Sequence, residues 1–251
     1  MAERKTKVVD ASPFEEDTTR SEPLPSSKKV SQSNKSTPNQ KTKTTTPFEI
    51  FNYCIDRAEN LIKIHQAAHG KKTKPEKYLA DAHRAAIVLS ISALDAFIRT
   101  YVIEKIRQLL ANKSQPLPQA LNEKIKKFCD ADSLLEAARN DDLLDRVEKA
   151  FLNDFQKKSF QGTKIINEIL QLIGIKDVFH SVAMKAKMNE DQIKQDLDEY
   201  TERRHLIAHR GDYDLQQQPP KEKVITKKYV KDCIKVVKVV AKHIKELEKA
   251  K

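Results

Sequence analysis

The chain has 251 residues, 39% hydrophobic and 33% charged, with a formal net charge of +11 at pH 7. The sequence contains only four glycines and no tryptophan, whereas Lys, Glu, Leu, Ile and Ala are plentiful. This composition favours helices over the turn-rich sheets of sandwiches and barrels. Three isolated cysteines without a CxxC spacing suggest neither a zinc site nor a disulfide framework, and a reducing cytoplasm fits them best. The positive charge favours a polyanionic partner such as RNA, DNA or an anionic membrane.

The N-terminal segment, residues 1–46, is rich in Ser, Thr, Lys, Pro, Asn and Gln. It has almost nothing to bury, so burial cannot offset the entropy of ordering it. We predict a disordered basic tail. Its first residues, MAERKTKVVDASPFEED, lack the apolar core of a secretory signal.

Two long helices are predicted next. The first begins at Pro47, after threonines that can cap it, and ends at Gly70. The second covers about 75–110, and its phrase AAIVLSISALDAFI is apolar on nearly every side, which places it at the centre of a bundle. The apolar stretch 85–98 is interrupted by polar residues and is too short to span a bilayer, so no membrane partner is expected.

Shorter helices are predicted over about 111–188, within which residues 176–187 are ambiguous. A longer helix follows, opened by Asn189 as N-cap and closed by Gly211. After a polar loop, apolar residues at helical spacing predict a last helix ending near Leu247, although its valines would also suit a strand. Residues 47–251 are thus predicted to form one all-α domain.

The phrase RRHLIAHRG, which ends the helix before the last, gathers three arginines and two histidines. Arg204 and His209 are five residues apart, which is about 140° around an ideal helix. For both to reach one substrate, either the helix loosens at its end, for which Gly211 is suited, or a second copy contributes. The simpler alternative is that the arginines only complement the negative end of the helix dipole.

The segment from Arg204 to His209 resembles the signature of the HEPN superfamily: an Arg, four to six residues, then a His, with Asn, Asp or His preferred directly after the Arg. SISALDAFIRTYV is similar to the family's second helix, which has an acidic residue at the place of Asp95. SFQGTKIINEILQLIGIKDVFHSVA and LDEYTERRHLIAHRGD are similar to segments of the RiboL-PSP-HEPN and MAE_28990-type branches. The resemblance covers most of residues 48–251.

This resemblance implies a HEPN-like helical bundle with extra short helices, about 111–188, between the second long helix and the motif helix. It also implies a metal-independent endoribonuclease without a cofactor, working as a homodimer in which the motif helices of two copies line one cleft. In that chemistry the 2′-hydroxyl of RNA attacks the neighbouring phosphate and leaves a 2′,3′-cyclic phosphate. Such an enzyme would act in the cytoplasm as a toxin or antiviral effector, and an antitoxin or other regulatory protein would be a further partner.

Within this scheme Arg204 is predicted to hold the phosphate, because a guanidinium binds two phosphate oxygens at once. His209 is predicted to act as general acid or base, because the pKa of histidine lies near the working pH. His205 lies on the same helical face as His209 and is expected to orient the substrate or its neighbour. Arg203 and Arg210 are expected to contact RNA or to cap the helix.

Asp95 is predicted to support the site. A carboxylate within an apolar helix is costly unless it is paired. Its partner is either Arg99, one turn later on the same helix, or Arg204 or a histidine across the bundle. In one branch of the superfamily a Tyr stands two residues after the motif His, whereas here Tyr213 stands four residues after it.

Two other functions remain open from the sequence: a non-catalytic dimeric module that binds RNA or a partner protein through the same cleft, and a purely structural adaptor. No metal site is predicted. His65 and His69 are four residues apart, but they lack a third ligand and are interpreted as surface or core histidines.

Overall fold

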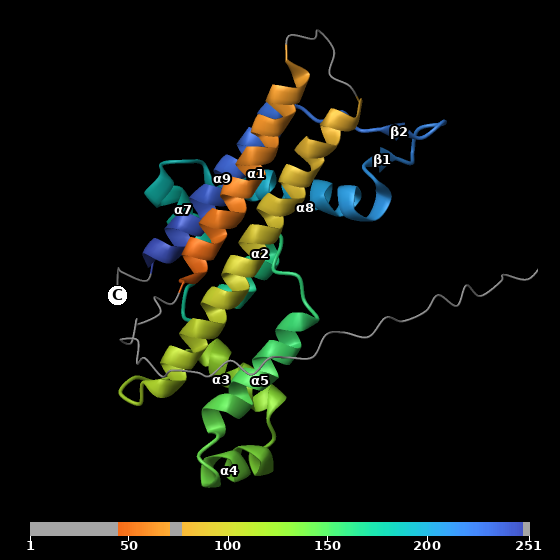
Figure 1. Cartoon of the computed structure of the whole chain (residues 1–251). Coiled ribbons are helices and arrows are strands. Elements are labelled where there is room, and N and C mark those ends of the chain that lie inside the picture. The colour runs from red at the N-terminus through yellow and green to blue at the C-terminus, as the bar shows by residue number, and fades with distance from the viewer. Residues whose placement is uncertain (1–44, 71–76, 248–251) are drawn as a thin grey trace, which may run out of the picture. The chain divides into compact units, whose positions relative to one another are not determined.

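The computed structural model describes residues 45–70 and 77–247, so the tail predicted over 1–46 lies almost wholly outside them. The described part of the chain is helical apart from a short 3-10 turn and a small hairpin (Figure 1). Its helices are α1 (Pro47–His69), α2 (Ala80–Ala111), α3 (Gln119–Phe128), α4 (Ala131–Arg139), α5 (Leu143–Gln156), α6 (Thr163–Gln171), α7 (Val178–Ala186), α8 (Glu190–Arg210) and α9 (Lys227–Leu247). The 3-10 turn η1 is Lys77–Leu79, and the strands are β1 (Tyr213–Asp214) and β2 (Lys221–Glu222). The predicted all-α fold is confirmed.

The first helix begins and ends where its sequence signals predict. Thr46 and Glu49 form a capping box, in which the Glu49 N–H donates to Thr46 Oγ1 at 3.2 Å and the Thr46 N–H donates to Glu49 Oε2 at 2.8 Å. Pro47 occupies the first helical position, where its missing N–H has no helical partner to lose. At the other end, Gly70 has a φ of 56° and closes the helix with a bond to the Gln66 carbonyl.

Helix α2 is the centre of the bundle, as its apolar phrase predicts. It packs against α1, α5, α8 and α9. Within the described residues, α2 is the one helix that is long and apolar enough to cross a membrane. The apolar stretch 85–98, on which the sequence prediction rested, is shorter than the whole helix. However, 56% of its apolar window is buried inside the protein, as in the core helix of a bundle.

The short helices expected between the second long helix, α2, and the motif helix, α8, are present as α3 to α7. Figure 1 shows α3, α4 and α5 near one end of α2, with the β1–β2 hairpin nearer the other end. The ambiguous segment 176–187 forms α7, which packs against α8 and α9. Four phenylalanines join this region in a chain of edge-to-face contacts, with ring centroids 4.8–5.7 Å apart: Phe128, Phe151, Phe155 and Phe160.

The last part of the domain differs from the sequence prediction in one respect. Helices α8 and α9 form as expected, and Asn189 caps α8 by accepting from the Gln192 N–H at 2.9 Å. The segment between them, predicted as a polar loop, instead contains the antiparallel pair β1–β2, with Tyr213 opposite Glu222 and Asp214 opposite Lys221. Strands of two residues are too short to leave a periodic signal in the sequence.

Two histidines are buried where α1 meets the beginning of α2. His65 is 8% exposed and His83 is 3% exposed, and their rings stack with centroids 3.8 Å apart. Burial, followed by the nearby His65, Lys227 and Arg84, lowers the pKa of His83 to about 4. Burial, His69 and Lys227 lower the pKa of His65 as well. The stacked pair is therefore neutral in the folded protein at neutral pH.

The free energy of unfolding should fall as the pH drops from 7 toward 4, by up to about 3 kcal/mol on account of His83. The unfolded chain takes up a proton on His83 near its ordinary pKa of 6.5, whereas the folded chain does not until about 4. Urea denaturation at several pH values should show this loss, and His83→Phe should reduce the difference between pH 7 and pH 4.5. An unchanged pH dependence in His83→Phe would contradict the prediction.

Candidate active site

The Arg–His motif occupies the last two turns of α8, which remains helical through Arg210. It ends at Gly211, whose φ of 59° and ψ of 23° are left-handed. The N–H groups of Gly211 and Asp212 both donate to the Leu206 carbonyl and so close the helix tightly. The helix end does not loosen, so the alternative in which loosening brings Arg204 and His209 together is wrong. Their side chains leave the helix about 140° apart.

Arg204 is half-buried but unpaired. Its Nε is shielded from solvent without a hydrogen-bond partner, and no carboxylate within the described residues forms an ion pair with its guanidinium. A buried donor left in this state costs about 1–3 kcal/mol. An anionic oxygen brought to this point would satisfy it, which makes Arg204 a candidate for binding a phosphate.

His205 and His209 lie side by side on one exposed face of the same helix. Their rings are nearly parallel, with an interplanar angle of 13° and centroids 6.0 Å apart. Partial desolvation, followed by the nearby Arg204 and His209, lowers the pKa of His205 below its ordinary value of 6.5. This shift favours the neutral form of His205, which can accept a proton. Arg210, also exposed, follows directly.

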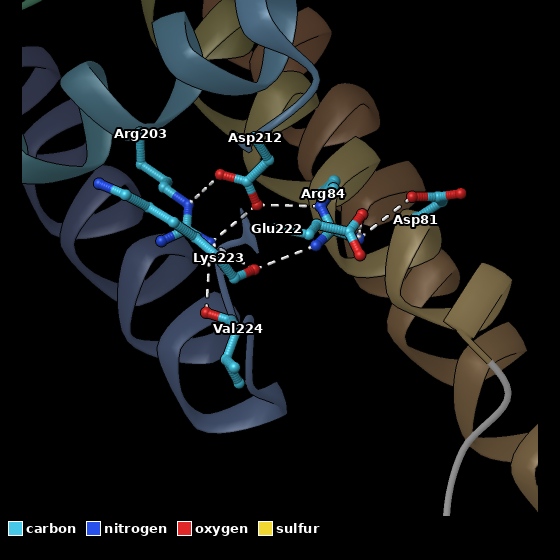
Figure 2. Close-up of polar contacts among 7 residues, drawn as sticks. All are labelled: Asp81, Arg84, Arg203, Asp212, Glu222, Lys223 and Val224. Atoms are coloured by element: carbon cyan, nitrogen blue, oxygen red, sulfur yellow. Dashed lines mark hydrogen bonds and ion pairs between the residues drawn. The ribbon is translucent and has the colours of Figure 1, made fainter. Parts of the chain in front are cut away.

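Arg203 points into the protein instead of toward solvent. Its Nε lies 2.7 Å from Asp212 Oδ1, and its Nη2 donates to Asp212 Oδ2 at 2.8 Å and to the carbonyls of Lys223 and Val224 (Figure 2). Asp212 is completely buried. Arg203 therefore donates its hydrogen bonds inside the fold. This role differs from the RNA contact or helix cap that the sequence led us to expect.

A second arginine reaches the same carboxylate from α2. Arg84, 6% exposed, places its Nε 2.9 Å from Asp212 Oδ2 and donates through Nη2 to the Lys223 carbonyl at 3.1 Å. Its Nη1 also lies 3.2 Å from both Asp81 and Glu222 (Figure 2). We call Arg84, Arg203 and Asp212 the buried ion cluster. It ties the beginning of α2, the end of α8 and the hairpin to one another.

Sequence reasoning missed both Arg84 and Asp212. The signal for Arg84 was present, because a charged residue at the edge of an apolar helix needs a buried partner, the argument applied to Asp95. Asp212 directly follows the glycine that ends α8 and has a left-handed φ of 67°, which Asp tolerates better than most residues. Nothing local pairs the two, because they are 128 residues apart in the chain.

Asp95 is paired with its own helix and not with the motif. Its Oδ1 lies 3.1 Å from Arg99 Nη2, and its Oδ2 accepts from Gln161 at 3.0 Å and Ser159 at 3.4 Å. Arg99 also donates to the carbonyls of Phe155 and Lys158. Of the alternatives considered for Asp95, the structure shows the pair with Arg99 on the same helix. Asp95 therefore holds the chain before α6 against α2.

Asp212→Asn should destabilise the protein by about 3–5 kcal/mol, because Arg203 then loses its carboxylate partner and Arg84 keeps only the more exposed Asp81 and Glu222. Urea denaturation measures the effect. Asp214→Asn, an equal change of charge two residues later on the hairpin, is the control and should change the free energy of unfolding by less than about 1 kcal/mol. An Asp212→Asn protein as stable as this control would show that the ion cluster does not hold the site together.

One comparison with known proteins gives a match. A protein-family model described as RiboL-PSP-HEPN matches residues 52–247, a range that includes α8, the buried ion cluster and Asp95. No curated protein and no solved structure matches the chain.

Proposed function

The chain belongs to the RiboL-PSP-HEPN family, and on that premise we propose that it is an endoribonuclease whose active site is built from Arg204 and His209. The observation that carries the proposal is the unpaired, half-buried Arg204, followed by two exposed histidines in the last turns of a helix that stays regular to its end. Its neighbour Arg203 uses its Nε and Nη2 within the fold, so Arg204 is the arginine of the pair left for a ligand.

The proposed chemistry follows from the side chains. The 2′-hydroxyl of RNA is the nucleophile, and the 5′-oxygen of the next nucleotide is the leaving group. His209 transfers a proton at one of these oxygens, and Arg204 offsets the charge that builds on the phosphate oxygens. His205, whose ring lies 6.0 Å from that of His209, orients the substrate or the neighbouring His209. The substrate supplies the nucleophile and the histidines move the protons, so the proposed mechanism requires no metal or cofactor.

A second copy of the chain completes the proposed site. Arg204 and His209 diverge by about 140° on a helix that stays regular to its end. Two such helices related by a two-fold axis can bring Arg204 of one copy near His209 of the other, and the same contact is repeated by symmetry. We therefore propose a homodimer with a composite cleft between the α8 ends.

The proposed biological role is that of a toxin or antiviral effector in the cytoplasm, held in check by an antitoxin or another regulatory protein. An enzyme that cuts RNA endangers its own cell, so its activity must be restrained. The net charge of +11 supports an RNA substrate, because a basic surface raises the rate of encounter with a polyanion.

Arg204→Ala and His209→Ala should each lower the rate of RNA cleavage in EDTA by at least about a hundredfold, from loss of charge stabilisation and of proton transfer. Arg204→Lys should recover little, because an ammonium group lacks the two-pronged geometry of a guanidinium. Gel analysis of a labelled RNA measures the rates, and mass spectrometry should find 2′,3′-cyclic phosphate ends.

The matched control for this experiment is Arg57→Ala, which removes one positive charge from an exposed position on α1 and should cleave like wild type. Cleavage by Arg204→Ala or His209→Ala at the control rate would refute the proposed site. RNA that is bound but left intact by the wild-type protein would favour the non-catalytic module instead.

A further inference from the structure

An exposed tyrosine stands directly beside the end of the motif helix. Gly211 turns the chain out of α8, and Tyr213 follows as the first residue of β1. Its ring lies against the turn: a methyl group added at Gly211 would be 3.7 Å from Tyr213 Cδ2, an ordinary van der Waals contact. The ring therefore borders the helix end that carries His209 and Arg210.

The Tyr213 ring is partly covered and partly open. It is 45% exposed, and no hydrogen bond or ring–ring contact engages it within the described part of the chain. Tyr200, in contrast, is 6% exposed and packs edge to face on Tyr229 in the core. One edge of the Tyr213 ring faces the turn at Gly211, whereas the open part of the ring is left without a hydrogen bond or ring contact in the described residues.

The backbone on both sides of Tyr213 is held in place. Asp212, the preceding residue, is the centre of the buried ion cluster, and its carbonyl accepts from the Lys223 N–H at 2.9 Å. Glu222, opposite Tyr213 in the hairpin, lies 3.2 Å from Arg84. The ring is thus presented from a fixed base, and little entropy would be lost if a ligand packed against it.

We propose that Tyr213 is a stacking platform for a base of the single-stranded RNA whose phosphate is held at Arg204. The proposal rests on the proposed function and adds a binding residue to that same site. An open aromatic face stacks on an unpaired base, and this contact is tolerant of sequence because every base has a π-face. Leu215, two residues further along the chain, is also exposed, at 58%.

The absence of tryptophan from the sequence makes a direct test available. Tyr213→Trp in a His209→Ala background, which should bind RNA without cleaving it, provides the single tryptophan. Oligo(A) and oligo(U) should change its emission in a saturable way, because stacking on a base alters tryptophan fluorescence. Tyr53→Trp, in the same background, places the reporter at a 64% exposed position on α1 and should show no change.

Affinity gives a second readout. In the His209→Ala background, Tyr213→Ala should weaken RNA binding about tenfold, whereas Tyr213→Phe should bind within about twofold of the parent. The salt dependence of binding should stay the same in Tyr213→Ala, because the ring contacts no phosphate. Arg210→Gln should reduce that salt dependence instead.

The outcomes separate the two proposals. Unchanged emission from the Tyr213→Trp reporter, or full affinity in Tyr213→Ala, while labelled RNA still binds by anisotropy, overturns the stacking role and leaves the proposed ribonuclease intact. Failure of the His209→Ala protein and of wild type to bind any RNA overturns both. The Phe and Ala variants carry the test alone if tryptophan perturbs the hairpin.

Discussion

Two arginines from distant parts of the chain share one completely buried carboxylate, and the arrangement of the site depends on this interaction. Asp212 lies between Arg84 of α2 and Arg203 of α8, with the Lys223 carbonyl accepting from both guanidinium groups. Loss of Asp212 would leave Arg203 without its carboxylate partner and Arg84 with only the more exposed Asp81 and Glu222, so the cluster favours this one arrangement. The central helix, the motif helix and the hairpin are thereby fixed relative to one another.

This constraint gives two adjacent arginines different tasks. Successive residues on a helix point about 100° apart, so if Arg203 faces inward, Arg204 must face sideways, where it is half-buried and unpaired. A helix carries partial negative charge at its C-terminal end, which disfavours a phosphate there. Arg204, Arg210 and the overall positive charge of the chain offset that effect. The tight closure at Gly211 keeps the motif helical, so Arg204 and His209 leave α8 about 140° apart.

Much of the fold was predictable because its signals are local. The capping residues Thr46 and Asn189 and the terminal glycines Gly70 and Gly211 mark helix ends through contacts within a few residues. The motif was predictable by resemblance alone. The buried ion cluster was not, because Arg84 and Asp212 are far apart in sequence, and no local pattern shows which of two neighbouring arginines faces inward. For the same reason the sequence left open whether Asp95 pairs with Arg99 or with Arg204 or a histidine across the bundle. In the structure Asp95 pairs with Arg99 and Gln161.

The central claim is that Arg204 of one copy and His209 of another form one catalytic pair, and mixing two inactive proteins tests it most directly. When Arg204→Ala and His209→Ala subunits exchange, each mixed dimer holds one composite site with both side chains intact. We predict that the mixture regains about a quarter of the wild-type cleavage rate, because about half of the dimers are mixed and one of their two sites works. A mixture as inactive as its components would contradict the claim.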